Sequence, residues 1–340
     1  MRKAIPMKIQ ETSAYARARR ASLCLAAGLA TMAMLAPVAQ ANNYPTKAIR
    51  LVVGSPPGAL GDVLARVSAQ NMGSGLGQPI VVDNKPGASL AIAADTVAKA
   101  NADGYTLLIA PDSATVVNPF LYPKLPYDPV KDFRSVGLIG KASLVMVVAN
   151  SLKIDTVEQL VQAAKAKPDS INYGSGGAGH PTHLAMEMFA NRMNIKLTHV
   201  SYKGTSPAIQ SLVTGEIGAM IVGVAEAMPL IIAGRIKPIA ASGPQAKEKF
   251  PALPELRSFN KDLDLSVWFG VFAPKATPQP VIDRLNSELN RTLALPEVRA
   301  KLDDFGMLAQ PGKPAALDAI QEDDRSRFGP LVKSLGLKVD

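Results

Sequence analysis

The stretch from Val52 to Asp62, VVGSPPGALGD, leads from a short apolar strand through a loop of glycines and prolines into a helix. Glycine lets backbone N–H groups approach a ligand closely, and a helix N-terminus adds about half a positive charge. Such a loop suits an anion, although a plain tight turn would also need its glycines. A second loop of this kind, YGSGGAGHPTHL, runs from Tyr173 to Leu184 after another predicted strand. Two such loops at matching places in the two halves of the chain favour a ligand site.

Neither loop has the spacing of a nucleotide or hydrolase motif. The first loop lacks G-x-G-x-x-G and is not followed by Gly-Lys-Ser/Thr. It is therefore neither a dinucleotide-binding loop nor a P-loop. Ser175 is not in a G-x-S-x-G elbow, because Tyr173 stands where the first glycine must be. His180, His183 and Glu187 fall at i, i+3 and i+7 on one helical face. Two interpretations therefore stay open. The three side chains could bind the zinc ion of a hydrolase, or a histidine could hydrogen-bond an oxygen atom of a ligand.

Residues 1–41 have the pattern of a signal peptide. Arginines 17, 19 and 20 precede an uncharged run over residues 21–36, and Ala39 and Ala41 supply the small residues of a cleavage site. That run is shorter than the ~20 residues of a membrane span. Cys24, the one cysteine of the chain, would leave with the signal, so no disulfide or thiol chemistry is expected. The mature protein is expected to be exported and soluble, starting near Asn42.

Most of the positive charge belongs to this predicted signal. The whole chain has 37 Lys and Arg against 28 Asp and Glu, a net charge of +9; residues 1–41 hold six and one of these, which leaves 31 against 27, or +4. The remaining Lys and Arg are scattered singly, without the basic stripe of a nucleic-acid-binding surface. Nucleic acid is therefore not expected as a partner.

Short β-rich runs alternate with runs of helical period, which predicts an α/β fold. Thr156, with Gln159 three residues on, and Thr277, before Pro278, are predicted to start helices. Strands are predicted at Ile49–Val53, Ile80–Val82, Tyr105–Ala110, Leu144–Ala149, Ile171–Tyr173, Leu197–Val200, Ile217–Val222, Ile236–Ala241 and Ser266–Ala273.

The chain after residue 41 is long enough for two domains. The runs Ser143–Ala149 and Leu265–Ala273 could each leave one sheet and enter another. We therefore expect domain 1 to comprise residues 42–143 plus 266–340 and domain 2 residues 144–265, each a mixed, mainly parallel sheet flanked by helices. Ligands of open α/β sheets bind beyond the carboxyl ends of the strands, which places the ligand cleft between the domains.

Several stretches, in order, resemble the Bug family of periplasmic solute receptors, the extracytoplasmic binding components associated with tripartite tricarboxylate transporters. They cover nearly the whole chain after the signal: YPTKAIRLVV (residues 44–53), DVLAR, LGQPIVVDNKPGA, DGYTLL, NPFLYPKLPYDPVKDF, YGSGGAGHPTHL, SYKG, VWFGVFAPKATP and the final LVKSLGLKVD. The resemblance implies a two-domain, type II periplasmic-binding-protein fold that closes on a small carboxylate. It also implies a monomer that is not an enzyme, needs no cofactor and is recognised, when loaded, by a membrane transporter.

Members of this family hold the carboxylate through backbone N–H groups and water in the two loops, and neither loop here contains Arg or Lys. The family's Pro-Gly-Gly falls on Pro57, Gly58 and Ala59, and its helix-starting Asp on Asp62. Its second loop falls on Ser175, Gly179 and His183. The expected ligand-binding residues are Ser55, Pro57, Gly58, Ala59, Gly61 and Asp62 in the first loop, Ser113, and Ser175, Gly179, His180, Thr182 and His183 in the second.

Departures from the family bear on specificity. Val222 stands where the family often has Asp, and His180 where it often has Ser. The loss of an acid and the gain of an imidazole predict a carboxylate with an apolar or aromatic body and not an amino acid. Trp268 is expected to pack in the core or at the hinge. Lys203 is expected to be a solvated loop charge, with a contact to a carboxylate as the alternative. A ligand-sensing partner of a membrane signalling protein would have the same pocket and stays a further alternative.

Overall fold

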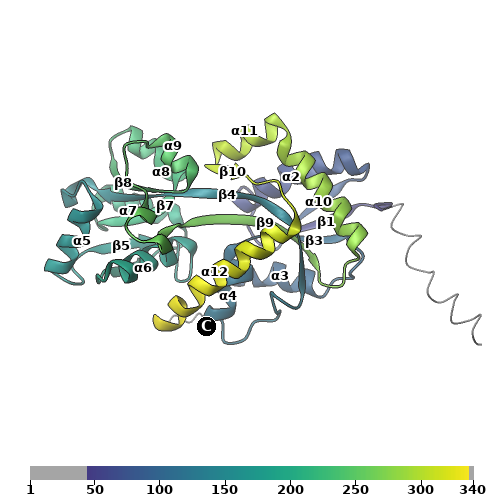
Figure 1. Cartoon of the computed structure of the whole chain (residues 1–340), viewed down its shortest axis with the longest axis horizontal. Helices are drawn as coiled ribbons and strands as arrows, with labels where there is room; N and C mark the ends of the chain where they lie inside the picture. The colour runs from purple at the N-terminus through teal and green to yellow at the C-terminus, as the bar shows by residue number, and fades with distance from the viewer. Residues whose placement is uncertain (1–43, 337–340) are drawn as a thin grey trace, which may run out of the picture. The chain divides into compact units, whose positions relative to one another are not determined.

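The computed structural model describes residues 44–336 (Figure 1). The predicted signal peptide, with Cys24, lies outside these residues. The strands are β1 (Ile49–Val53), β2 (Ile80–Asn84), β3 (Thr106–Pro111), β4 (Phe133–Ala149), β5 (Asn172–Ser175), β6 (Thr198–Ser201), β7 (Ala219–Gly223), β8 (Ile236–Ser242), β9 (Ser266–Pro274) and β10 (Met307–Ala309). The α-helices are α2 (Leu60–Leu76), α3 (Ala91–Ala98), α4 (Asn118–Leu121), α5 (Val157–Ala166), α6 (Pro181–Met193), α7 (Thr205–Thr214), α8 (Val224–Ile232), α9 (Pro244–Lys249), α10 (Gln279–Ala294), α11 (Pro296–Asp304) and α12 (Pro314–Ser334).

The long strand β4 changes its pairing partners along its length. Up to Ser143, which lies opposite Ser266, it pairs with β9, and from Leu144 onward it pairs with β7 and β8. The strand order is β2-β1-β3-β9-β4-β7-β5-β6, and β8 and β10 also pair with β4. Figure 1 shows β4 and β9 running lengthwise between two groups of elements. We call the group around β1, β2 and β3 the first lobe and the group around β5, β6 and β7 the second lobe.

Strand direction decides where the loops of each lobe gather. Strands β1, β2 and β3 are parallel, as are β5, β6 and β7, whereas β4 and β9 run antiparallel to their neighbours. Because the carboxyl ends of parallel strands share one edge of a sheet, the loops that follow β1 and β3 lie together, and so do those that follow β5, β6 and β7. These loops carry most of the predicted site.

Every predicted strand is present, but β4 begins at Phe133, well before the predicted Leu144. The register of its pairing with β9 shifts between Ser135 and Gly137 and again between Leu138 and Gly140. Glycines at such irregularities interrupt the alternation that identifies a strand in a sequence, so the first half of β4 could not be recognised from its pattern.

One of the two predicted helix starts is confirmed. Thr156 caps α5, because its Oγ1 accepts a hydrogen bond from the N–H of Gln159 at 3.2 Å. The prediction for Thr277 is wrong. Helix α10 begins at Gln279 with Pro278 in the capping position and no side-chain cap, and within residues 44–336 the buried Thr277 Oγ1 has no hydrogen-bond partner. Pro278 itself has the extended backbone conformation of an N-cap. Thr277 therefore lies one residue before the capping position.

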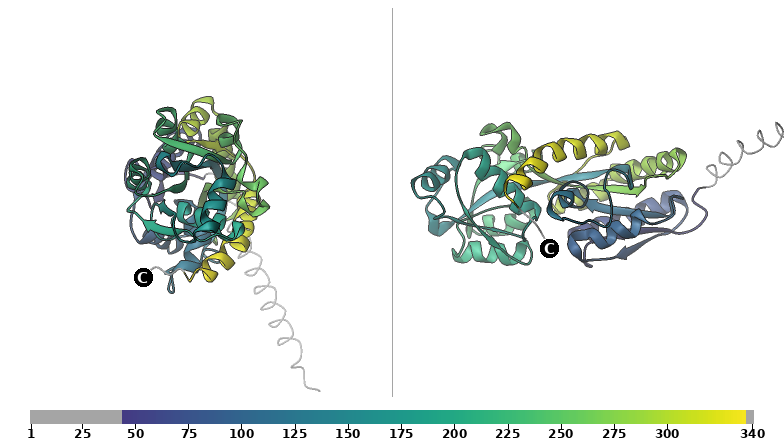
Figure 2. Two further views of the ribbon diagram at one scale, coloured as in Figure 1. Left: turned by 90° about the vertical axis from the view of Figure 1, so that its left-hand side faces the viewer. Right: turned by 90° about the horizontal axis from the view of Figure 1, so that it is seen from below.

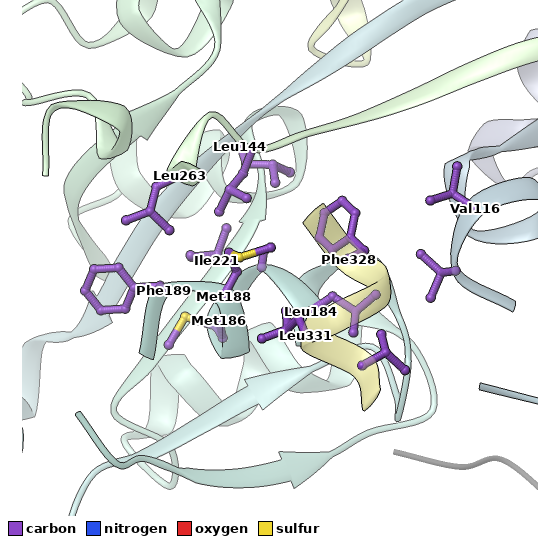
Figure 3. Close-up of a cluster of buried hydrophobic side chains, with 14 of the residues drawn as sticks. Val116, Leu144, Leu184, Met186, Met188, Phe189, Ile221, Leu263, Phe328 and Leu331 are labelled. Atoms are coloured by element: carbon purple, nitrogen blue, oxygen red, sulfur yellow. The ribbon is translucent and has the colours of Figure 1, made fainter. Parts of the chain in front are cut away.

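One apolar core extends through both lobes. On α6, Leu184, Met188 and Phe189 pack with Ile221 of β7, and Phe328 and Leu331 from the end of α12 join the same cluster (Figure 3). Helix α12 therefore lies against both groups of elements (Figure 2).

Trp268, on β9, is fully buried, and its Nε1 donates to Asp324 Oδ2 on α12 at 2.6 Å. The indole therefore packs in the core, as expected. Between residues 44 and 336, no helix has both the length and the apolar character needed to cross a membrane.

Candidate ligand-binding site

A pocket of about 530 Å³ lies where the loops of the two lobes meet. The first lobe supplies residues that follow β1, β2 and β3, the second supplies residues that follow β5, β6 and β7, and Phe305 follows α11. The crossing strands β4 and β9 contribute its apolar floor. The lining is Ser55, Ala59, Leu60, Gly61, Leu90, Pro111, Ser113, Asn118, Leu121, Ala142, Leu144, Gly176–Thr182, Thr205, Gly223, Ala225, Glu226, Val267, Phe269 and Phe305.

Helices α2, α6, α7 and α8 all begin in the wall of this pocket. The first N–H groups of a helix have no acceptor within the helix, and they carry the positive end of its dipole. Helices α2, α7 and α8 have no side-chain cap at this end. Their first turns can therefore donate hydrogen bonds to a bound anion.

Helix α6 and the second loop are different, because their N–H groups are largely satisfied within the protein. The N–H of Gly176 donates to Thr182 Oγ1 at 3.0 Å, and the N–H of Gly179 donates to His183 Nδ1 at 3.0 Å. His180 Nδ1 caps the helix by accepting from the N–H of Thr182 at 3.3 Å. In this arrangement the second loop offers fewer backbone donors to a ligand than its glycines suggest.

Two residues predicted from the second loop lie behind the lining. Ser175 is fully buried, and its Oγ is 2.7 Å from His199 Nε2. The ring of His183 stacks on that of His199 with centroids 3.9 Å apart. Burial lowers the pKa of His183 to about 3 and that of His180 to about 4, so both rings are neutral at pH 7. Ser175 and His183 therefore support the loop.

Asp62 supports the first loop in a similar way. Its buried carboxylate accepts hydrogen bonds from the N–H of Gly58, from Arg66 Nε and from Asn84 Nδ2, each at 2.9 Å. The hydrogen bond from Arg66 is the main cause that lowers the pKa of Asp62 to about 2. Gly58 has a φ of +85°, in the left-handed region that glycine adopts without strain. These bonds fix the course of the loop ahead of α2.

The predicted site residues thus fall into two groups, and contact with a ligand stays a prediction for both. Ser55, Ala59, Gly61, Ser113, Gly179, His180 and Thr182 line the pocket; Pro57, Gly58, Asp62, Ser175 and His183 do not.

The apolar part of the lining was missed by sequence reasoning. It includes Leu90, Leu121, Leu144, Val267, Phe269 and Phe305. Leu90 has a φ of +75°, unusual for leucine, and its side chain lies so close to Gly54 that a Cβ there would be 2.5 Å from Leu90 Cδ2. Thr205 and Glu226 were also missed, although each stands at the beginning of a helix after a predicted strand. The rule that ligands lie beyond the carboxyl ends of strands could have identified both.

Within the described part of the chain, Glu226 is the one charged side chain in the lining. Its Oε1 accepts a hydrogen bond from Thr205 Oγ1 at 3.0 Å. The side chain is open to the pocket, but protein atoms around it remove part of its water. This desolvation raises the pKa of Glu226, whereas the hydrogen bond from Thr205 lowers it by a smaller amount.

Val222 is fully buried in a core cluster and does not line the pocket. The missing acid at Val222 is therefore no reason to exclude an amino-acid ligand, because Glu226 brings a carboxyl group into the lining. Lys203 lies in an exposed loop outside the lining, as a solvated charge would.

The three residues of the zinc alternative do not converge. His183 Nε2 lies 3.8 Å from Glu187 Oε1, which also accepts a hydrogen bond from the hydroxyl of Tyr173. His180 Nδ1 faces Thr182 Oγ1 instead, at 2.9 Å. Across residues 44–336, no group of three or more His, Cys, Asp or Glu side chains is arranged to hold a metal ion.

Comparison with known proteins agrees with this architecture. BugT of Bordetella pertussis is 33% identical over 316 residues, which cover 92% of this chain and 96% of BugT. The structure of Rpa4515 of R. palustris with adipate matches with a TM-score of 0.75 and 30% identity, over 87% of this chain and 100% of that one. MatC from Rhodopseudomonas palustris with bound malate matches with a TM-score of 0.72 and 28% identity, over 85% of this chain and 100% of that one.

Together with matches to a periplasmic transporter and to the periplasmic binding protein BugD, these structures confirm the predicted fold class, a two-domain periplasmic-binding-protein fold. Residues 64–337 match the family described as the tripartite tricarboxylate transporter family receptor. The chain therefore belongs to the tripartite tricarboxylate transporter receptor family, to which the Bug proteins are related.

Proposed function

We propose that this protein is a periplasmic receptor that binds a small organic carboxylate in the pocket between its lobes and presents it to a tripartite tricarboxylate-type transporter. The observation that carries the proposal is the uncapped start of α2 in the wall of a pocket that loops of both lobes line. Helix N-termini bind carboxylates without a basic side chain. Among the described residues of the lining there is neither Lys nor Arg.

The lining also supports a ligand with an apolar or aromatic body. Leu90, Phe269 and Phe305 present apolar surface beside the polar helix starts, and pockets for small molecules commonly pair such a wall with a few polar groups that fix orientation. Two relatives are described with adipate and with malate bound, so small carboxylates fit receptors of this fold.

Binding would be completed by closure of two domains, residues 42–143 plus 266–340 and residues 144–265. The hinge would lie where β4 changes partners, at Ser143 and Leu144, and where β9 begins at Ser266. Closure removes water from the pocket and strengthens each hydrogen bond to the carboxylate. The residues predicted to act are Ser55, Ala59, Gly61, Ser113, Gly179, His180 and Thr182 in the lining, held by those behind it. The protein would act as a monomer and without catalysis.

A thermal-shift screen of residues 42–340 tests the proposal. Mono-, di- and tricarboxylates, aromatic acids and amino acids would be compared, and the metal content of the same sample measured. A ligand at 100 times its Kd adds about 2.7 kcal/mol of stability, since only the folded state binds. One class of carboxylate should therefore raise the melting temperature by several degrees. No shift with any acid, together with one zinc per chain, would contradict the receptor and favour the hydrolase.

A further inference from the structure

Glu226 is the unusual feature of a pocket that otherwise suits an anion. It stands in the first turn of α8 and faces the start of α7, where Thr205 Oγ1 donates to its carboxylate. The side chain also folds back over Gly223, the capping position of α8, because a Cβ on Gly223 would lie 3.8 Å from Glu226 Cδ. The carboxylate of Glu226 is therefore held at the N-terminal ends of two helices.

Within residues 44–336, no basic side chain forms an ion pair with this carboxylate. The described lining also holds no Lys or Arg. The positive ends of α7 and α8 thus already have an internal anion. A ligand carboxylate placed there would meet a like charge in a partly desolvated site, where repulsion is stronger than in water.

Among the described residues, the opposite side of the pocket has no such acid. It offers the uncapped first turn of α2, with Leu60 and Gly61 in the lining, and the hydroxyl groups of Ser55 and Ser113. A carboxylate bound there avoids Glu226, and the other end of the ligand then points toward the second lobe. That end can satisfy the free acceptor positions of Glu226 only if it donates a hydrogen bond.

Resting on the proposed function, we infer that Glu226 determines the ligand specificity of the pocket. It selects an acid that has one carboxylate and, at its far end, a hydrogen-bond donor such as a hydroxyl or ammonium group. It rejects dicarboxylates. The first lobe holds the carboxylate and Glu226 accepts from the donor. A polar group that faces the ligand in a closed pocket discriminates strongly in this way, because a ligand that lacks the matching group leaves it unpaired.

Isothermal titration with acids of matched skeleton tests this inference. Hexanoate, 6-hydroxyhexanoate, 6-aminohexanoate and adipate differ at the far end alone, and the four-carbon and 4-substituted benzoate series extend the comparison to other lengths and to aromatic bodies. The variants are Glu226→Gln, which removes the charge and keeps the size, and Glu216→Gln as the matched control. Glu216 lies outside the pocket, where it accepts from Ser211 Oγ at 2.9 Å.

The wild-type protein should bind the hydroxy or amino acid of the fitting series about tenfold or more tightly than the dicarboxylate of equal length. Glu226→Gln should lose this preference, chiefly by a gain in affinity for the dicarboxylate, and Glu216→Gln should keep it. Equal or tighter binding of the dicarboxylate by the wild type, or an unchanged preference in Glu226→Gln, overturns the inference and leaves the receptor intact. Failure of the wild type to bind any acid of these series overturns the inference, whereas the proposed function falls only if the thermal-shift screen also finds no ligand.

Discussion

The Nδ1 atom of His183 accepts a hydrogen bond from the backbone N–H of Gly179 at 3.0 Å. This bond joins the first turn of α6 to the loop that precedes it, at a glycine with a φ of +74° that lines the pocket. It requires an unprotonated Nδ1, because a protonated imidazole has two donors and no acceptor. The shape of the second loop therefore depends on a neutral His183.

The stability of the protein should consequently fall on acidification. Burial depresses the folded-state pKa of His183 to about 3, below the ordinary unfolded value, so the unfolded state binds more protons between these two values. The stability that a neutral, buried histidine gives the folded state is fully present above pH ~6.5. It is lost as the pH falls, and at pH 5 the loss is about 2 kcal/mol for each such histidine. His183→Asn keeps an acceptor for Gly179 but does not titrate, so its free energy of unfolding should vary less between pH 7 and pH 5. An equally steep pH dependence in this variant would contradict the assignment.

Gly58→Val should abolish binding while the protein stays folded. The φ of +85° is unfavourable for valine and costs about 1–3 kcal/mol, although a Cβ there would meet no atom within 4 Å. Relief of this strain would move the loop that places Ala59 and Gly61. Gly234→Val is a matched control, since Gly234 has a φ of +65°, has equal space for a Cβ and lies outside the pocket. If both variants bind the ligand alike, the first loop is not the site.

Leu90→Gly should weaken the binding of acids with an apolar body at little cost in stability. The loss of a partly buried side chain and the relief of a left-handed backbone each change the free energy by about 1–2 kcal/mol, in opposite directions. Ala88→Gly is the control, because Ala88 also has a positive φ, of 44°, but does not line the pocket. It should raise the melting temperature and leave affinity unchanged. Equal affinity in the wild type and Leu90→Gly would remove this leucine from the ligand contacts.

Trp268→Phe should destabilise the protein by about 1–3 kcal/mol, the cost of leaving a buried acceptor unpaired. The indole Nε1 donates to Asp324 on α12, and burial already raises the pKa of this carboxyl. Denaturant unfolding followed by circular dichroism gives the change. Trp268→Phe combined with Asp324→Leu removes both partners and should recover part of the loss; a double variant as unstable as the sum of the single variants would show that the hydrogen bond contributes little.

How far the fold could be predicted depends on how local its causes are. The bounds of β1, Ile49–Val53, follow from an apolar run that ends at a glycine loop, and the cap of α5 follows from Thr156 and Gln159. The early start of β4 could not be predicted from the local sequence. Gly137 and Gly140 are part of a strand only because they pair with β9, which lies far along the chain.

The candidate site shows the same division. Sequence spacing placed Ser55, Gly61 and His180 in glycine loops beside helix starts, and the structure puts them in the lining. The sequence could not reveal that the side chains of Asp62 and His183 turn back and bind to their own loops. The direction of a side chain depends on partners that lie elsewhere in the chain, here Asn84 and His199. Glu226 was overlooked because the expected acid was sought at Val222, whose side chain faces the core.

The most direct test of the account is a crystal structure of residues 42–340 with the acid that gives the largest thermal shift. The ligand should occupy the pocket between the lobes, with its carboxylate within hydrogen-bond distance of the N–H groups at the start of α2, near Gly61, and with its body against Leu90 and Phe305. A carboxylate bound instead at Lys203, or anywhere outside this pocket, would contradict it.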